Sequence, residues 1–324
     1  MADSLLILAR AVQLGAGMLL AGVVAFRWLI LLPAFAGADD AAWLALGPLF
    51  RRLGALFVAS GVALLLSGLA LFWAVAAEMS GASLAESLDP GTLATVLFQT
   101  QFGMLSQGRL GLAVLLAALM VPLVRGRWLA RRRCSTLEIA AGIVAAALMV
   151  SFAGTGHAGA SGARGFAAHL AVDALHLAVT AIWPAGLLPF ALFLASARQE
   201  MSASAPVLRV VRRFSAISLA VVLLLTASGV VNAWFMLGHV SALFTTAYGE
   251  LLGVKLLLFA AILGIAACNR YRLVPAVLEH AEKFPGAEAG ALLRLQRLVV
   301  AEFVLALVII LVVGVLGMTS PPPS

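Results

Sequence analysis

Long apolar segments alternate along the chain with short polar connections. A helix needs about 20 apolar residues to cross the hydrocarbon core of a bilayer. Lipid offers the backbone no hydrogen bonds, so a crossing segment must be a helix or a strand of a closed barrel, and these segments lack the alternation of barrel strands. The pattern therefore predicts an all-α integral membrane protein of about eight transmembrane helices. The spans lie near residues 4–32, 47–78, 107–124, 136–155, 165–196, 209–237, 244–271 and 293–318.

The composition agrees with this prediction. Hydrophobic residues make up 63% of the chain and charged residues 11%, whereas soluble domains carry about 25% charged residues. The net charge of +7 comes from arginines between the apolar spans, so we expect a lipid bilayer around the protein and no nucleic-acid partner. The first span, from Leu5 to Leu32, is longer than the apolar core of about 7–15 residues in a secretory signal. We therefore expect it to be a retained helix.

The connections between the spans differ in charge, and this difference predicts the orientation. Every second connection, starting with the first, is rich in basic residues, while the other three hold only Arg164 and, at a helix start, Arg109. Basic connections of membrane proteins stay in the cytoplasm. We therefore expect a multi-pass protein with both termini on the outer side. The basic residues are Arg51, Arg52, Arg125, Arg127, Arg131, Arg132, Arg133, Arg198, Arg209, Arg212, Arg213, Arg270, Arg272, Lys283, Arg294 and Arg297.

The two halves of the chain resemble each other. Residues of the second helix return in the sixth, residues around the start of the third return at a constant spacing around the start of the seventh, and Glu138 and Glu302 hold corresponding places in the fourth and eighth. Repeats of four helices keep one orientation, so we expect two four-helix repeats related by a pseudo-twofold axis along the membrane normal. The matching sets are Arg51, Arg52, Ser67, Gly68 and Trp73 with Arg212, Arg213, Ser228, Gly229 and Trp234, and Phe98, Thr100, Phe102, Gly103 and Arg109 with Phe244, Thr246, Tyr248, Gly249 and Lys255.

One face of the predicted fifth helix carries three groups suited to binding a metal. His169, Asp173 and His176 stand at positions i, i+4 and i+7 and so share a helical face. A carboxylate between two imidazoles can orient a ring and raise its basicity, as it does around metal sites. Hydrogen-bonded packing groups are the alternative, but ionisable groups inside a membrane usually face the bundle interior and serve a function. We therefore take all three as candidate metal ligands.

Three further candidate ligands lie toward the same outer side. His157 ends the fourth helix, and His239 ends the sixth, where Asn232, Met236 and His239 form a second stripe at helical spacing. A thioether beside an imidazole suits copper, and sulfur favours the cuprous ion. Ordinary packing is the alternative for a methionine on a helix. His157, His239 and Met236 therefore complete the candidate metal-binding set.

Two charged residues lie well inside the last two predicted helices. Lys255 is in the seventh helix and Glu302 is in the eighth. They form neutralising interhelical pairs, Lys255 with Glu302 or with Asp173, or they act as a gate or proton relay along an ion path. We keep both interpretations and take Lys255 and Glu302 as candidate gating or ion-path residues.

The chain lacks the common motifs of hydrolytic and ATP-driven chemistry. It contains no Walker motif, no Gly-x-Ser-x-Gly elbow, no His-Glu-x-x-His and no Cys-x-x-Cys. We therefore expect a protein that is not an enzyme and that has no catalytic residues, with a membrane redox activity as the alternative.

From about Thr92 to its end, the sequence resembles the copper-resistance D (CopD) family of bacterial inner-membrane proteins. The matching pieces are Gly156-His157-Ala158, Asp173-Ala174-Leu175-His176 with Ile182-Trp183, Arg213-Phe214-Ser215, Thr246-Ala247-Tyr248-Gly249 with Leu251-Leu252 and Lys255, and then Asn269-Arg270, Pro275 and Glu302. Their order across four helices carries the resemblance. It implies copper handling at the bacterial inner membrane, periplasmic termini and a periplasmic copper-binding partner of the CopC type, and it favours His157, His176 and Glu302 as functional positions.

The resemblance also divides the chain and exposes two departures. We expect residues 1–135 to form helices one to three with a basic cytoplasmic loop, and residues 136–324 to form the CopD-like helices four to eight. The family's usual histidine in helix one is here Gln13, opposite His176 in the repeat, which puts a symmetric two-site mechanism in doubt. The family's Trp-x-Gly-Gly pattern reads Trp183-Pro184-Ala185-Gly186, and the proline is expected to kink helix five just below His176.

The leading hypothesis is a permease that moves copper from the periplasm to the cytoplasm. Copper is expected to be captured by His157 and His239 with Met236, and passed to His176 beside Asp173. The alternative is a transmembrane electron-transfer protein that binds haem b through helix-borne histidines, as in cytochromes b561. A third hypothesis is a non-catalytic membrane partner that docks a periplasmic chaperone.

Overall fold

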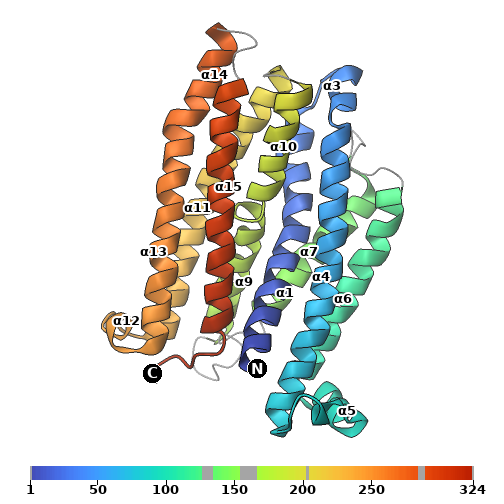
Figure 1. Cartoon of the computed structure of the whole chain (residues 1–324), viewed down its shortest axis with the longest axis vertical. Coiled ribbons are helices and arrows are strands. Elements are labelled where there is room, and N and C mark those ends of the chain that lie inside the picture. The colour runs from blue at the N-terminus through green and yellow to red at the C-terminus, as the bar shows by residue number, and fades with distance from the viewer. Residues whose placement is uncertain (1, 126–133, 154–165, 202–203, 284–288, 323–324) are drawn as a thin grey trace.

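The computed structural model describes residues 2–125, 134–153, 166–201, 204–283 and 289–322, and every regular element in these ranges is helical (Figure 1). Seven of the helices are long and apolar enough to cross a membrane. The expected all-α architecture is therefore confirmed. The fourth expected span, residues 136–155, corresponds to α7, which is apolar but has only 16 residues in the described part. His157 lies outside the described residues.

The first half of the chain forms one long kinked rod, two further long helices and several short ones. Its elements are α1 (Ala2–Ala25), the π-helical turn η1 (Phe26–Leu31), α2 (Leu32–Ala34), α3 (Asp40–Ala45), α4 (Gly47–Ser80), η2 (Glu86–Leu88), α5 (Pro90–Gln99), α6 (Gln101–Arg125) and α7 (Thr136–Ser151). The rod from α1 through η1 to α2 is continuous, so it forms the first span.

The second half of the chain begins with two helices that are separated by a short turn. Its elements are α9 (Phe166–Ile182), α10 (Leu187–Glu200), α11 (Ala205–Leu237), α12 (Ala242–Thr245), α13 (Ala247–Cys268), the π-helical turn η5 (Asn269–Leu273), α14 (Val274–Lys283) and α15 (Ala289–Leu316). Both ends of the chain lie at the same end of the bundle (Figure 1). The spans predicted from the sequence agree with the described helices to within four residues, with two exceptions: α6 begins six residues earlier than predicted, and the seventh span continues through η5 and α14 to Lys283.

The expected interruption of helix five is confirmed. The turn Trp183–Gly186 separates α9 from α10. Pro184 has no N–H to donate, and the next amide, of Ala185, bonds to the carbonyl of Thr180 at 3.2 Å, five residues back. A Cβ at position 186 would lie 2.3 Å from the carbonyl oxygen of Ile182. The turn therefore requires glycine at that position.

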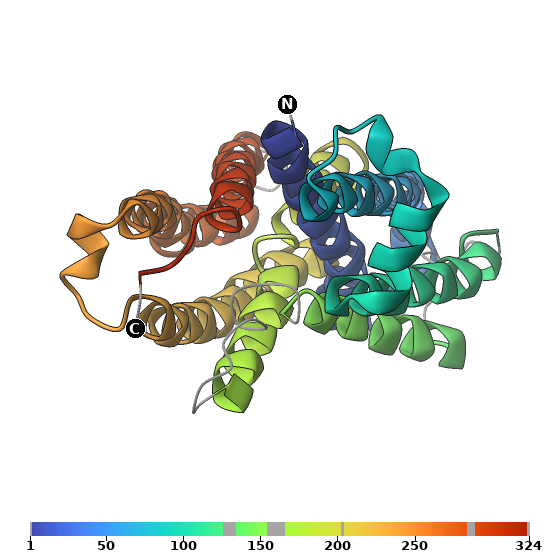
Figure 2. The ribbon, with the colours of Figure 1, turned by 90° about the horizontal axis from the view of Figure 1, so that it is seen from below.

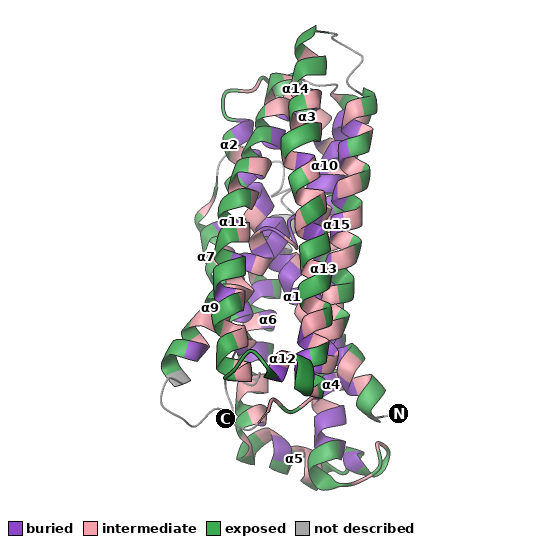
Figure 3. Ribbon diagram, turned by 90° about the vertical axis from the view of Figure 1, so that its left-hand side faces the viewer, coloured by how far each residue is buried: buried purple, intermediate pink, exposed green. Residues whose placement is uncertain are grey.

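The first helix of each half lies at the centre of the bundle. The most apolar 18-residue stretch of each span shows this difference. In this stretch, 67% of the first span and 61% of the span formed by α9 and α10 are buried, against 11–28% for the other spans. Seen from the end that holds both termini, the helices of the two halves lie on opposite sides with α1 and α9 between them (Figure 2). The outward faces of α11 and α13 are exposed or half-buried, as lipid-facing surfaces are (Figure 3).

A buried ion pair ties the central rod to α7. The guanidinium of Arg27, in the π-helical turn η1, lies 3.0 Å from the carboxylate of Glu138, and both side chains are 0% exposed. The other carboxylate oxygen of Glu138 accepts the amide of Ser135 at 2.8 Å, which completes a capping box at the start of α7. One carboxylate therefore both caps α7 and neutralises a cation in the core.

We expect Arg27→Gln to destabilise the protein by about 3–5 kcal/mol, because it leaves the Glu138 carboxylate buried without its cation. Thermal unfolding of the purified protein in detergent measures the loss. The double variant Arg27→Gln with Glu138→Gln removes both charges and should recover most of the stability. Equal destabilisation by the single and the double variant would contradict this account.

Candidate functional site

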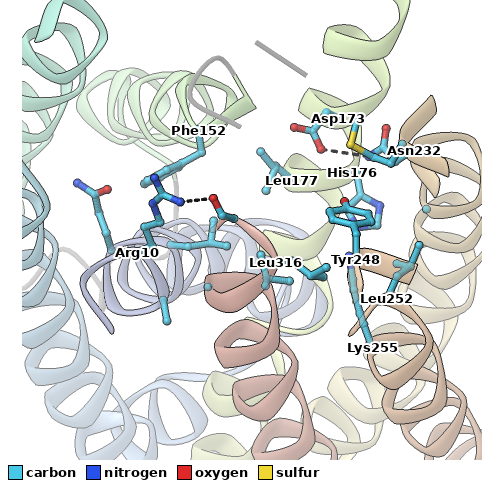
Figure 4. Close-up of a pocket in the computed structure, with 18 of the residues that line it drawn as sticks. Arg10, Phe152, Asp173, His176, Leu177, Asn232, Tyr248, Leu252, Lys255 and Leu316 are labelled. Atoms are coloured by element: carbon cyan, nitrogen blue, oxygen red, sulfur yellow. Dashed lines mark hydrogen bonds between the residues drawn. The ribbon is translucent and has the colours of Figure 1, made fainter. Parts of the chain in front are cut away.

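A cavity of about 270 Å³ opens near the end of the bundle that holds both termini (Figure 4). It lies between helices of both halves, and most of the polar side chains that line it come from segments that cross the apolar core. These side chains are Arg10, Gln13, Arg109, His169, Asp173, His176, Asn232, Met236, Tyr248 and Lys255. Because polar groups inside a membrane usually mark a binding site or an ion path, this cavity is the candidate functional site.

The three groups predicted on one face of helix five all line this cavity. His169, Asp173 and His176 project from α9, one to two turns apart. His169 is 4% exposed, and its ring stacks on Phe235 of α11 with 4.7 Å between the ring centroids. The shared face predicted from the spacing is therefore present, with His176 deepest along α9.

His176 is held in one orientation by α11. Its Nδ1 lies 2.9 Å from the hydroxyl of Ser228, and that hydroxyl donates its own hydrogen to the carbonyl of Leu224 at 2.8 Å. The hydroxyl is therefore left to accept from Nδ1–H of His176, and the lone pair of the neutral ring is then on Nε2. A neutral imidazole nitrogen is the form that binds metals. A Cβ at Gly229 would lie 3.3 Å from Cε1 of His176, so glycine lets the ring approach α11 closely.

Asp173 faces a mixed set of polar neighbours. Its carboxylate accepts a hydrogen bond from the side-chain amide of Asn232 at 3.1 Å, and its charge interacts with that of Lys255 on α13. The amide oxygen of Asn232 is buried, and no residue in the described part of the chain forms a hydrogen bond with it. Asp173, His176, Tyr248 and Lys255 lie together on one side of the cavity, opposite Arg10 and Phe152 (Figure 4). This side of the cavity therefore combines two groups that can bind a cation, Asp173 and His176, with the ammonium group of Lys255.

The two candidate ligands of helix six are placed differently. Met236 lines the cavity. His239 is exposed in the turn after α11, where its Nδ1 accepts the amide of Ala242 at 3.1 Å and lies 2.8 Å from the hydroxyl of Ser241. Its Nδ1 therefore caps the short α12, and His239 is not among the residues that line the cavity.

The first half of the chain supplies a cationic wall. The guanidinium of Arg109 donates to the side-chain oxygen of Gln13 at 3.3 Å and to the carbonyl of Ser151 at 3.0 Å, and it lies over the ring of Phe152. Arg10 donates to the carbonyl of Gly317 near the end of the last helix. The wall opposite Asp173 and His176 thus carries positive charge.

Glu302 lies apart from this cavity. It accepts a hydrogen bond from the side-chain amide of Asn269, and roughly 20 Å of helix separates Asn269 from Lys255. The pair of Lys255 with Glu302, one of two alternatives that the sequence left open, is therefore wrong, and Asp173 is the acidic neighbour of Lys255. Glu302 lines a second cavity, of about 220 Å³, closer to the arginine-rich end of the bundle.

The described residues do not form a complete metal site. No group of three or more histidine, cysteine, aspartate or glutamate side chains is close enough in them to hold a metal ion. Sequence reasoning also missed Arg10 and Arg27, which were available as single charges inside the first apolar span. The position of Ser228 under His176 emerges only from the packing of α9 on α11.

Two family models match this chain. Residues 1–166 match the N-terminal domain of copper resistance protein D-like proteins, and residues 208–316 match copper resistance protein D. No solved structure matches the chain.

Three curated bacterial proteins are similar to the chain. Copper resistance protein D of Pseudomonas syringae pv. tomato is 33% identical over 53% of this chain and 56% of its own length. Copper transport protein CutJ of Bacillus subtilis (strain 168) is 29% identical over 59% of this chain and 34% of its own length. Inner membrane protein YebZ of Escherichia coli (strain K12) is 33% identical over 62% of this chain and 65% of its own length.

The chain thus covers between about one third and two thirds of the length of these relatives. One family model alone covers just over half of the chain, and the second lies in the other half. With its apolar helices, these matches show that the chain belongs to the copper resistance protein D family of copper resistance and transport membrane proteins.

Proposed function

We propose that this protein is a permease that moves copper from the periplasm to the cytoplasm across the bacterial inner membrane. The observation that carries the proposal is the cavity in which His169, Asp173 and His176 of α9 face Met236 and Lys255. Its donor groups, imidazole and thioether, are those that copper prefers. The names of two relatives, a copper resistance protein and a copper transport protein, support copper as the substrate.

In this proposal the cavity captures copper on its acidic side. Nε2 of His176 and the thioether of Met236 bind the ion, and the carboxylate of Asp173 offsets its charge. His157 and His239 deliver copper to the cavity from the outer side. The residues bind and pass the ion on rather than catalyse a reaction. Because three suitable side chains are not gathered at one point in the described residues, binding is expected to be weak enough for release.

Lys255 is proposed to be the gate. It and His176 line both the main cavity and an apolar cavity of about 150 Å³. That apolar cavity also reaches Trp183, which lines the cavity of Glu302. The three cavities therefore follow one another toward the arginine-rich end of the bundle. The ammonium group of Lys255, where the first two cavities meet, repels a cation until it is displaced or neutralised.

The proposed orientation places both termini in the periplasm and opens the main cavity toward that side of the membrane. The support is that the arginine-rich helix ends lie opposite the termini (Figure 1), as the positive-inside rule requires for cytoplasmic loops. A periplasmic copper-binding protein of the CopC type is the partner we propose for the outer end of the cavity, where it would supply the ion.

We further propose that α7 is an eighth crossing and that the halves are related by a pseudo-twofold axis along the membrane normal. Two equivalent turns support the repeat. Thr100 caps α6 by accepting the amide of Gly103 at 2.9 Å, and Thr246 caps α13 by accepting the amide of Gly249 at 3.0 Å. A Cβ at either glycine would lie 2.1 Å from a carbonyl oxygen of the preceding short helix.

The centre of the bundle supports the same axis. Gln13 lies against Gly68 in the same way that His176 lies against Gly229. Gln13 and His176 are 163 positions apart in the sequence. The same spacing relates Gly22 to Ala185, and a Cβ at Gly22 would lie 2.8 Å from that of Ala185. Residues at corresponding positions therefore touch each other, as residues on a twofold axis must.

His176→Ala is the direct test of the copper site. It should reduce copper binding by more than about 100-fold and abolish copper uptake into proteoliposomes, since losing even an outer partner of a metal ligand costs 10–100-fold. Metal analysis of purified and reconstituted protein under reducing conditions measures both. His280→Ala, an exposed histidine in α14, is the matched control and should change neither.

Unchanged binding and uptake in His176→Ala would overturn the permease proposal. An optical spectrum of the same purified protein separates it from the haem alternative. A Soret band that disappears in His176→Ala, without copper uptake, would make the protein a haem b carrier instead.

Ser228→Ala tests whether the hydroxyl positions His176. The ring would lose the acceptor of its Nδ1–H, so copper affinity should fall by about 10–100-fold while the fold is kept. The matched control is Ser67→Ala on α4, whose hydroxyl also donates to its own helix, at the carbonyl of Ala63, but belongs to the half that carries Gln13. Equal effects of the two variants on copper affinity would contradict a role specific to His176.

A further inference from the structure

The second cavity contains a buried carboxyl group whose partner is neutral. Glu302 is 2% exposed, and its hydrogen-bond partner is the side-chain amide of Asn269, in the π-helical turn η5. None of the ion pairs in the described part of the chain includes Glu302. A carboxylate held in apolar surroundings by a neutral group is unfavourable, whereas a protonated carboxyl is tolerated there.

The side-chain amide of Asn269 lacks one hydrogen-bond donor in the described part of the chain. Its nitrogen donates to Glu302, but its oxygen is buried and has no hydrogen-bond partner among the described residues. A buried acceptor without a donor costs about 1–3 kcal/mol. The O–H of a protonated Glu302 is a donor on the side chain that already contacts this amide. Both groups are therefore better satisfied when Glu302 carries a proton.

In the first half of the chain, a buried glutamate is paired with a cation instead of a neutral amide. Glu138 corresponds to Glu302 in the repeat, and it pairs with Arg27. The spacing of 163 residues that aligns Gln13 with His176 aligns Arg27 with Phe190, whose ring lines the cavity of Glu302. A phenylalanine thus replaces the guanidinium, and a cavity adjoins the carboxyl group.

The remaining charged and titratable groups around this cavity do not neutralise Glu302. Arg270 of η5 donates to the carbonyl of Ser215 at 2.7 Å and to its hydroxyl at 3.0 Å. Tyr271, also from η5, is 69% exposed, so the cavity reaches the protein surface at that point. From α11, α10 and the turn before α10 the cavity receives serine hydroxyls and apolar or aromatic side chains. On α10, Arg198 binds Gln296 of α15 at 2.8 Å.

We propose that Glu302 and Asn269 form a proton-binding site that exchanges its proton with water through this cavity, on the arginine-rich side of the membrane. The reaction is the dissociation of the carboxylic acid into a carboxylate and a proton taken up by water, and it needs no other reactant. Its use in transport rests on the proposed function: one proton would leave or return at Glu302 as each copper ion passes.

Infrared difference spectroscopy of the full chain in lipid, recorded between acidic and alkaline buffers, tests the site without copper. The wild-type protein should show the carbonyl stretch of a protonated carboxyl group, and the band should shift in D₂O because the proton exchanges. Glu302→Gln should remove this band, and Glu302→Asp should retain one at a changed frequency. The double variant Arg27→Gln with Glu138→Gln is the control and should leave the band unchanged.

A band that persists in Glu302→Gln, or one that does not shift in D₂O, would overturn the proposal. Copper uptake by proteoliposomes distinguishes the two proposals. If the wild-type protein shows the Glu302 band but does not take up copper, the proton site is supported and the permease function is contradicted. If it takes up copper but lacks the band, the permease function is supported and the proton site is contradicted.

Discussion

Lipid offers no hydrogen bonds and no counter-charge, so each polar group in the spans of this protein must find its partner inside the bundle. The two central helices provide most of these partners. Arg27 meets Glu138, Arg109 meets Gln13, and Asp173 meets Asn232. These contacts hold α6, α7 and α11 against the central helices, because Arg109, Glu138 and Asn232 each lie where they can reach a partner there.

The two halves of the chain differ in how their buried polar groups are held. In the first half, Gln13 accepts a hydrogen bond from Arg109, and Glu138 pairs with Arg27. In the second half, His176 is held by Ser228, and Glu302 accepts a hydrogen bond from the amide of Asn269. The polar groups of the first half are thus bound to one another, and the groups that can bind a cation or a proton are gathered in the second.

Much of the fold follows from the sequence, because hydropathy and proline act locally. The spans, the break at Pro184 and the common face of His169, Asp173 and His176 depend on residues a few turns apart. The ion pair between Arg27 and Glu138 joins residues 111 positions apart, and no periodicity reveals such a contact. For the same reason the sequence leaves two acidic partners open for Lys255. It also does not reveal that His239 caps α12, because that contact depends on the fold of the turn after α11.

Both buried glutamates are held by residues in π-helical turns, Arg27 in η1 and Asn269 in η5. A π-helical turn closes its hydrogen bonds over five residues and so contains one residue more than an α-helical turn. Deleting one residue there would restore the α-helix and rotate all residues on one side of the turn by about 100° relative to the other. The chemistry of each glutamate therefore depends on the length of a helix as well as on its side chains, so an insertion or a deletion could create or remove such a site without changing any functional residue.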